Sequence, residues 1–214
     1  MPLTSETQSK IAEYLLQIKA VKLQPKEPFT WASGWKSPIY CDNRIALSFP
    51  VIRTYIRQQL VHLVQEEFGT PEIIVGVATA GIPQGVLVAQ ELGLPFAYVR
   101  SAPKDHGRQN LVEGEVSPGQ RAVVIEDLVS TGKSSLKCIE ALKERGLEVV
   151  GLVSIFDYGF EEAEQEFKKI RCRFFSLCNY EFLLQEALKG NYISQQEREY
   201  LQEWRLNPSS WTPA

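Results

Sequence analysis

Two adjacent carboxylates, Glu126 and Asp127, directly follow a run of three aliphatic residues, Val123 to Ile125. An unbroken apolar run of this kind is typical of a strand that is buried on both faces of a parallel sheet. Ligands of such sheets bind beyond the carboxyl ends of the strands. We therefore expect the two acids at a ligand site, where a carboxylate can accept hydrogen bonds from both vicinal hydroxyls of a ribose.

A loop of small residues, Val129 to Ser134, separates the acids from a helical pattern over 135–145. Successive backbone N–H groups that lead into a helix N-terminus favour anions. The loop is not a nucleotide P-loop, because the glycine that this motif requires five residues before Gly132 is Asp127 here. The pattern predicts a ribose phosphate site, and the alternative is a strand end with solvated acids before a capped helix.

Strands and helices that would position this site alternate from Glu72 onward. Such alternation predicts an α/β fold with a doubly wound parallel sheet. Upstream, we expect an irregular hairpin over 29–44 that forms a hood over the carboxyl edge of the sheet. The strands are expected over 73–77, 96–100, 149–156 and 174–177, and the helices over 5–20, from Pro50, and over 81–92, 161–169, 180–189 and 195–205.

The apolar periodicity stops between Arg100 and Arg121, and residues 101–110 are polar. Lys104 and His106 add positive or potentially positive groups just after the expected end of a strand. A long polar loop within a compact α/β domain is usually either a functional lid or a disordered segment. Its place at the carboxyl edge of the sheet favours the lid.

Composition excludes several classes of protein. The 214 residues fit one domain, and a formal net charge of −3 argues against a general nucleic-acid binder. No segment has the apolar length of a membrane span or the apolar core of a signal peptide, so we expect a soluble cytoplasmic protein with no nucleic-acid or membrane partner. The four cysteines form no CxxC pair and are expected as reduced thiols: Cys41, Cys138, Cys172 and Cys178.

Three stretches, 29–44, 99–114 and 123–134, together resemble the orotate phosphoribosyltransferase family of the type I phosphoribosyltransferases. The acidic pair with its loop is similar to the superfamily motif for 5-phosphoribosyl 1-pyrophosphate (PRPP). The hood residues around Ser33-Gly34 and Ser37-Pro38, together with the lid, narrow the resemblance from the superfamily to its orotate-specific members. It implies one domain over 1–214, a hood mainly over 22–48, a flexible catalytic loop at about 101–115, and transfer of the phosphoribosyl group from PRPP to orotate.

The resemblance also implies a role for each matching residue. The catalytic residues would be Arg100, Lys104, His106 and Asp127. PRPP would be bound by Thr79, Ala80, Gly81, Arg100, Lys104, His106, Glu126, Asp127, Leu128, Val129, Ser130, Thr131, Gly132, Lys133 and Ser134. Orotate would be bound by Lys36, Tyr40, Arg44, Ser130 and Tyr158. Mg²⁺ would be carried by PRPP without a direct protein ligand, and the lid would reach into the neighbouring site of a homodimer.

Several cations of the enteric members of the family are replaced in this chain. Lysines of the hood, the lid and the pyrophosphate loop become Ala32, Ser101 and Ala80, and an arginine that binds orotate becomes Tyr158. The available replacements lie in the hood, and we hypothesise that Arg44 contacts the orotate carboxylate while Lys36 lies near the substrates. Both could instead be solvated hairpin charges.

Two rival functions remain at this stage. A phosphoribosyltransferase for a purine or another pyrimidine would keep the acidic pair and change the hood. A regulator that senses PRPP without turnover would need a nucleic-acid-binding module, and the sequence shows neither a basic recognition helix nor a spare domain for one.

Overall fold

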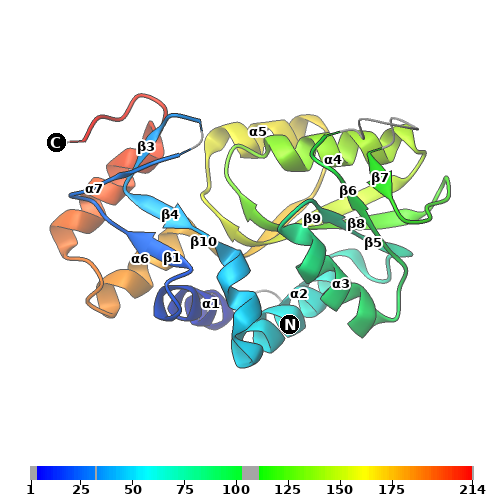
Figure 1. Ribbon diagram of the computed structural model, residues 1–214, viewed down its shortest axis with the longest axis horizontal. Coiled ribbons are helices and arrows are strands. Elements are labelled where there is room, and N and C mark those ends of the chain that lie inside the picture. Colours follow the sequence, from blue (N-terminus) through cyan, green and yellow to red (C-terminus); the bar gives the residue numbers. More distant parts are fainter. Residues whose placement is uncertain (1–3, 32, 103–110, 214) are drawn as a thin grey trace.

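The computed structural model describes residues 4–31, 33–102 and 111–213 of the chain. A six-stranded sheet forms the centre of the molecule (Figure 1). Five strands are parallel and β7 is antiparallel at one edge. In spatial order the strands are β10 (Phe174–Asn179), β9 (Glu148–Asp157), β8 (Arg121–Val129), β5 (Ile73–Val77), β6 (Phe96–Val99) and β7 (Val112–Glu113).

Helices cover both faces of this sheet (Figure 1). One face carries α1 (Ser5–Gln17), α2 (Pro50–Phe68) and α3 (Gly81–Leu92), and the other carries α4 (Lys133–Glu144) and α5 (Glu161–Lys169). Alternate residues of the central strands enter opposite cores: Val123 and Ile125 join one apolar cluster, whereas Val124 joins the other. Burial on both faces explains why these strands have continuous apolar sequences, and it confirms the predicted doubly wound α/β fold.

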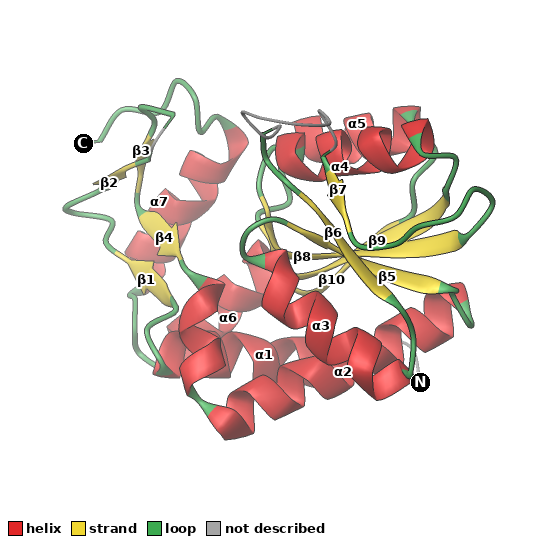
Figure 2. Ribbon diagram, turned by 45° about the vertical axis from the view of Figure 1, so that its right-hand side comes forward, coloured by secondary structure: helices red, strands yellow, loops and turns green. Residues whose placement is uncertain are grey.

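The hood, residues 22–48, lies at one side of the sheet beside the two C-terminal helices, α6 (Tyr180–Lys189) and α7 (Gln195–Leu206) (Figure 2). It contains two small antiparallel pairs and a 3-10 helix, η1 (Asn43–Ser48). Trp204 of α7 supports the hood, because its indole N–H donates to the carbonyl oxygen of Lys36 at 3.0 Å. The pairs are β1 (Val21–Leu23) with β4 (Ile39–Cys41), and β2 (Phe29–Thr30) with β3 (Lys36–Ser37).

Most of the expected elements are found, with local differences. The helix α1 is capped by Thr4, whose hydroxyl accepts from the Thr7 N–H, and it ends at Gln17. The pairing of β1 with β4 was not predicted from the sequence. The strand β8 continues through both acids to Val129, because Glu126 and Leu128 pair with β9.

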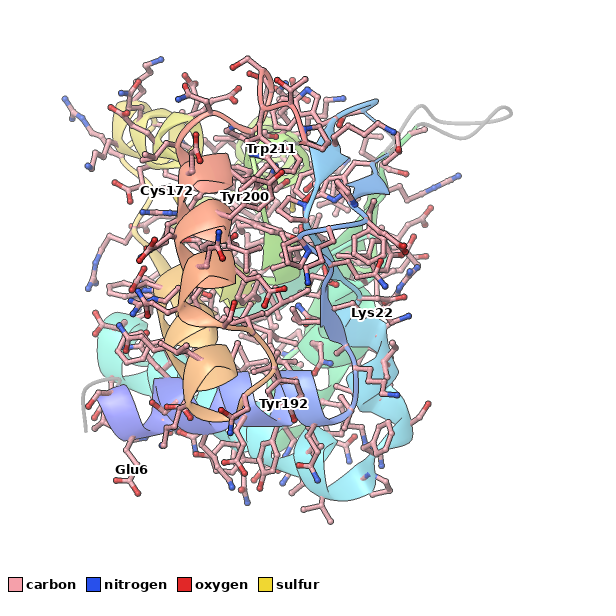
Figure 3. All side chains as sticks on the ribbon, turned by 90° about the vertical axis from the view of Figure 1, so that its left-hand side faces the viewer. Glu6, Lys22, Cys172, Tyr192, Tyr200 and Trp211 are labelled. Carbon is pink, nitrogen blue, oxygen red and sulfur yellow. The ribbon has the colours of Figure 1, made fainter. Side chains whose placement is uncertain are left out.

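The side view in Figure 3 shows the C-terminal helices next to the hood. Tyr200 and Trp211 form a separate aromatic contact there, with ring centroids 5.1 Å apart. Within the described residues, no helix combines the length and the apolar character needed to cross a membrane. All four cysteines are free thiols.

Candidate active site

The acidic pair lies in the second half of β8, and Glu126 is the more deeply buried of the two, with 4% of its surface exposed. One Glu126 oxygen accepts from the backbone N–H of Asp127 at 3.1 Å. The other accepts from the hydroxyls of Ser134 and Ser135 at 3.3 and 3.4 Å. Glu126 therefore ties the strand to the first turn of α4.

The two acids also influence each other's ionisation. Burial, and next the charge of Asp127, raise the pKa of Glu126 well above its usual value. Burial likewise raises the pKa of Asp127, whereas the hydrogen bond with Glu126 and the positive charge of Arg44 lower it. Hydroxyl donors or a cation placed beside this pair would favour the ionised forms. The pair is thus suited to accept the hydroxyl groups of a sugar.

The predicted phosphate loop, 129–134, runs from the last residue of β8 through the link 130–132 into the first turn of α4. Gly132 adopts a left-handed conformation, with φ of +75°, directly before the first residue of α4. The base of the loop is held in place because the Tyr158 N–H donates to the carbonyl oxygen of Val129 at 3.0 Å. The turn leads into the positive end of the α4 dipole, which favours a phosphate there.

A second tight loop, residues 78–81, connects β5 to α3. The peptide bond between Ala78 and Thr79 is cis. Gly81 is required at the start of α3, because a Cβ at this position would lie 2.5 Å from the carbonyl oxygen of Ile125 on β8. This close approach places the loop predicted to meet the pyrophosphate next to the strand that carries the acidic pair.

A cavity of about 200 Å³ lies where β5, β6 and the first turns of α4 meet. Three cations line it, Arg100, Lys133 and Lys137, and none of its described lining residues is acidic. Arg100 also lies 3.6 Å from a carboxylate oxygen of Glu113. Lys137 was not predicted as a site residue, although its spacing of four from Lys133 places both on one helix face. The cavity is suited to an anion.

The hood contributes several of the residues predicted to bind orotate. Arg44 is 59% exposed at its side chain and forms two hydrogen bonds with Asp42, of 2.6 and 2.8 Å. Lys36 donates to the hydroxyl of Thr30 at 2.7 Å, and Tyr40 is partly exposed. Arg44 lies close enough to Asp127 to influence its pKa, so the hood and the acidic pair meet at one site.

Tyr158 lies deeper than a ligand-binding role requires. Only 1% of it is exposed, and its ring packs against those of Trp31, Phe160 and Trp204 at centroid distances of 5.2, 5.4 and 5.9 Å. Its place in this structure is in the aromatic core below the hood, and a contact with orotate stays a prediction. Lys104 and His106 lie outside the described residues, so their predicted roles also stay predictions.

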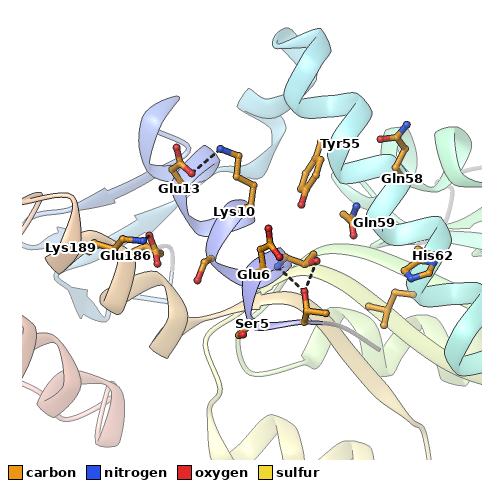
Figure 4. A pocket seen from close by; sticks show the side chains of 14 residues that line it. Ser5, Glu6, Lys10, Glu13, Tyr55, Gln58, Gln59, His62, Glu186 and Lys189 are labelled. Carbon is orange, nitrogen blue, oxygen red and sulfur yellow. Dashed lines mark hydrogen bonds and ion pairs between the residues drawn. The ribbon is translucent and has the colours of Figure 1, made fainter. Parts of the chain in front are cut away.

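A polar groove of about 1060 Å³ lies elsewhere, between α1, α2 and α6 (Figure 4). Lys10 and Glu13 form a 2.9 Å ion pair on its wall, and Tyr55 and His62 line the opposite side. The groove contains none of the predicted site residues, so the candidate site remains the carboxyl edge of the sheet.

Comparison with known proteins agrees with this geometry. The family model described as a phosphoribosyl transferase domain matches residues 51–189. The orotate phosphoribosyltransferases of Phocaeicola vulgatus and Porphyromonas gingivalis are each 55% identical to this chain, and the alignments cover 94% of this chain and 94% and 96% of theirs. The solved orotate phosphoribosyltransferase of Aeropyrum pernix is 29% identical, with a TM-score of 0.75 over 86% of this chain and 99% of that chain.

Proposed function

Because this chain belongs to the orotate phosphoribosyltransferase family, we infer that it transfers the 5-phosphoribosyl group of PRPP to orotate. The products are orotidine 5′-monophosphate and pyrophosphate, and the reaction is a step of pyrimidine nucleotide (UMP) biosynthesis. The structural observation that carries this function is the meeting of the acidic pair, the phosphate loop and the hood at the carboxyl end of β8.

We propose that Asp127 accepts hydrogen bonds from the ribose hydroxyls, while Glu126 supports the phosphate loop and faces the same sugar. The backbone and hydroxyl groups of 129–134 would hold the 5′-phosphate, since the loop ends at the positive end of α4. Residues 79–81 would meet the pyrophosphate through backbone groups. This arrangement leaves the anomeric carbon of the ribose below the hood, where orotate would enter.

Breaking the bond at the anomeric carbon produces an oxocarbenium-like centre and a highly charged leaving group. Catalysis is therefore mainly electrostatic, and cations must meet the negative charge that grows on pyrophosphate. Arg100 would serve here, and Lys133 and Lys137 add positive charge to the neighbouring cavity. Together they offset part of the loss of cations at Ala80 and Ser101.

We propose Mg²⁺ as the metal of the reaction, carried into the site by PRPP. When bound, it would neutralise charge on the pyrophosphate oxygens. Mg²⁺ keeps several waters and is commonly held through substrate phosphates and one or two carboxylates. The residues present fit this mode, because the carboxylates of Glu126 and Asp127 near the carboxyl end of β8 supply oxygen acceptors for the waters that the ion would keep.

Arg44 is the proposed partner of the orotate carboxylate, since a guanidinium can bind a carboxylate through two parallel hydrogen bonds. Lys36, Tyr40 and Ser130 would complete the surroundings of the base. The orotate ring nitrogen is already acidified by its carbonyl neighbours, so the reaction needs no protein nucleophile. This fits a site whose described residues offer acids, cations and backbone groups.

The remaining proposals concern assembly and location. We propose a homodimer in which Lys104 and His106 of one subunit reach the pyrophosphate bound to the other. Closing of such a lid would exclude water and so suppress hydrolysis of PRPP. The cytoplasm is the proposed location, and four free thiols are compatible with its reducing conditions.

One assay tests the substrate assignment. Purified protein is given PRPP and Mg²⁺ with orotate, adenine, hypoxanthine or uracil in parallel, and release of pyrophosphate is measured. We expect release with orotate to exceed that with each other base by more than about 100-fold, because a site built around a carboxylate-binding arginine discriminates against bases that lack this group. Equal or faster reaction with a purine would contradict the proposal.

A further inference from the structure

A buried amide connects the hood to the strand that carries the acidic pair. Asn43 begins η1 and has no exposed surface. Its Nδ2 donates to the backbone carbonyl oxygen of Asp127 at 2.7 Å, although the two residues are 84 positions apart in the sequence. Its Oδ1 accepts from the Sγ of Cys41 at 3.3 Å. Both polar ends of the amide are therefore occupied, as a buried amide requires.

The two partners of the Asn43 amide, the Asp127 carbonyl and the Cys41 thiol, fix which way it points. Burial raises the pKa of the Cys41 thiol well above its usual value, so the sulfur keeps its proton and can act as a donor. The oxygen of the Asn43 amide must then face Cys41, and its NH₂ group must face Asp127. A carbonyl oxygen is an acceptor only, so the orientation is the one that satisfies all three groups.

The residues next to Asn43 belong to the proposed orotate site. Asp42 and Arg44 form an ion pair through two side-chain hydrogen bonds. Asp42 also accepts from the backbone N–H of Arg44 at 3.2 Å. The segment 42–44 is joined to β8 at the backbone of Asp127. The relative position of Arg44 and Asp127 is consequently set through the amide of Asn43.

Other hydrogen bonds hold the hood without reaching β8. The indole of Trp31 donates to the carbonyl oxygen of Ile39 inside the hood, and that of Trp204 reaches the hood from α7. Loss of either bond would loosen the hood as a whole. The bond from Asn43 differs because its partner is the residue that is proposed to hold the ribose.

We propose that Asn43 is a positioning residue for the transfer reaction, which aligns the orotate held by the hood with the ribose held by Asp127. The inference rests on the function given above. Reacting atoms must lie within about 3 to 3.5 Å with their orbitals aligned, and a displacement of about 1 Å lowers the rate by roughly 100-fold. Asn43 touches neither substrate in this account and acts through the two groups that it connects.

The test compares two reactions of one preparation. Transfer to orotate needs alignment between hood and ribose, whereas slow hydrolysis of PRPP without orotate needs the ribose site alone. We expect Asn43→Ala to lower the ratio of transfer to hydrolysis by about 10- to 100-fold. Partial unfolding reduces both reactions equally and leaves the ratio unchanged. The matched control is Tyr180→Phe, which also removes a buried hydrogen bond to a backbone carbonyl, at Leu201 over 3.0 Å, and should leave the ratio unchanged.

A milder variant, Cys41→Ala, keeps Asn43 and its bond to Asp127 and removes only the supporting bond at the amide oxygen. We expect a drop of about 2- to 5-fold in the same ratio, in line with the loss of one weak hydrogen bond. This variant decides the question if Asn43→Ala does not fold. An unchanged ratio in the folded variants overturns the role of Asn43, whereas failure of the wild-type chain to use orotate overturns the function itself.

Discussion

The guanidinium of Arg44 pairs with Asp42, and it is also the proposed partner of the orotate carboxylate. Its side chain is mainly exposed, so the Asp42 pair contributes little to the stability of the fold. An exposed and preorganised guanidinium is well placed to accept a new anion. If Arg44 binds orotate as proposed, its pair with Asp42 would hold the guanidinium in position beforehand.

Arg44→Ala should therefore affect orotate far more than it affects folding. Loss of a charge-assisted hydrogen bond predicts a rise in the Michaelis constant for orotate of about 10- to 100-fold. The measurement is steady-state kinetics with each substrate varied in turn, together with the urea midpoint of unfolding. Lys22→Ala removes another cation of the hood and serves as the control. Unchanged orotate kinetics for Arg44→Ala would rule out the contact.

Asp157 makes the stability of the fold depend on pH. Burial raises the pKa of this carboxyl to about 6, although the Gly159 N–H donates to it at 2.9 Å. Between about pH 4 and 6 the folded chain then binds more protons than the unfolded chain, so stability falls as the pH rises through this window. The shift corresponds to roughly 1 to 3 kcal/mol.

Asp157→Asn should remove the loss of stability at higher pH, because a neutral amide keeps the acceptor for the Gly159 N–H without a buried charge. We expect the variant to match the wild type near pH 4 and to exceed its free energy of unfolding above pH 6. Urea titrations at several pH values measure the difference. Asp42→Asn is a control of opposite sign, since the hydrogen bond from Arg44 lowers the pKa of Asp42. A difference for Asp157→Asn that does not change with pH would contradict the assignment.

At the scale of elements, α7 acts as a support for the hood. Trp204 is fully buried, and its N–H bonds the backbone of Lys36 in β3. Trp204→Phe removes this bond and should raise the Michaelis constant for orotate by about 2- to 10-fold, as expected for one hydrogen bond. The constant for PRPP should stay nearly unchanged, because the acids and the phosphate loop belong to other elements.

The matched control for α7 is Trp211→Phe, in which the same substitution is made at a ring that packs on Tyr200. Both constants should stay close to those of the wild type. If Trp204→Phe raised the Michaelis constants for orotate and PRPP equally, α7 would support the whole site and not the hood alone.

The sequence predicted the elements that have a strong local period and missed those that depend on distant contacts. The helix α5 and the strand β5 were placed at their observed bounds, because their apolar residues and flanking breaks are local signals. The strand β8 was expected to end before its acids. Glu126 is polar, yet it is buried and paired with β9, so the strand continues beyond it.

The hood likewise depends on contacts between distant residues, which the sequence does not reveal. The partner of β1 lies well beyond the next turn, so no local pattern reveals the pairing with β4. Asn43 looks like an ordinary turn residue in the sequence, and only the fold brings it to Asp127. The acidic pair and its loop were found because their chemistry lies within one short segment.

At the scale of the whole molecule, the question is whether each site is completed by a second subunit. The acidic pair lies on β8, whereas Lys104 and His106 follow β6 in the sequence. If that segment serves the neighbouring subunit, the two sets of residues in one site come from different chains. Subunits with complementary defects can then restore one site between them.

Lys104→Ala and Asp127→Ala subunits, each nearly inactive alone, test this arrangement when they are co-expressed with different tags. A mixed dimer would contain one site with both defects and one intact site. Random pairing makes half of the dimers mixed, so the preparation should recover about a quarter of the wild-type activity. Mixed dimers isolated through both tags should show about half of it. If the loop acts within its own subunit, every site carries one defect and no activity returns.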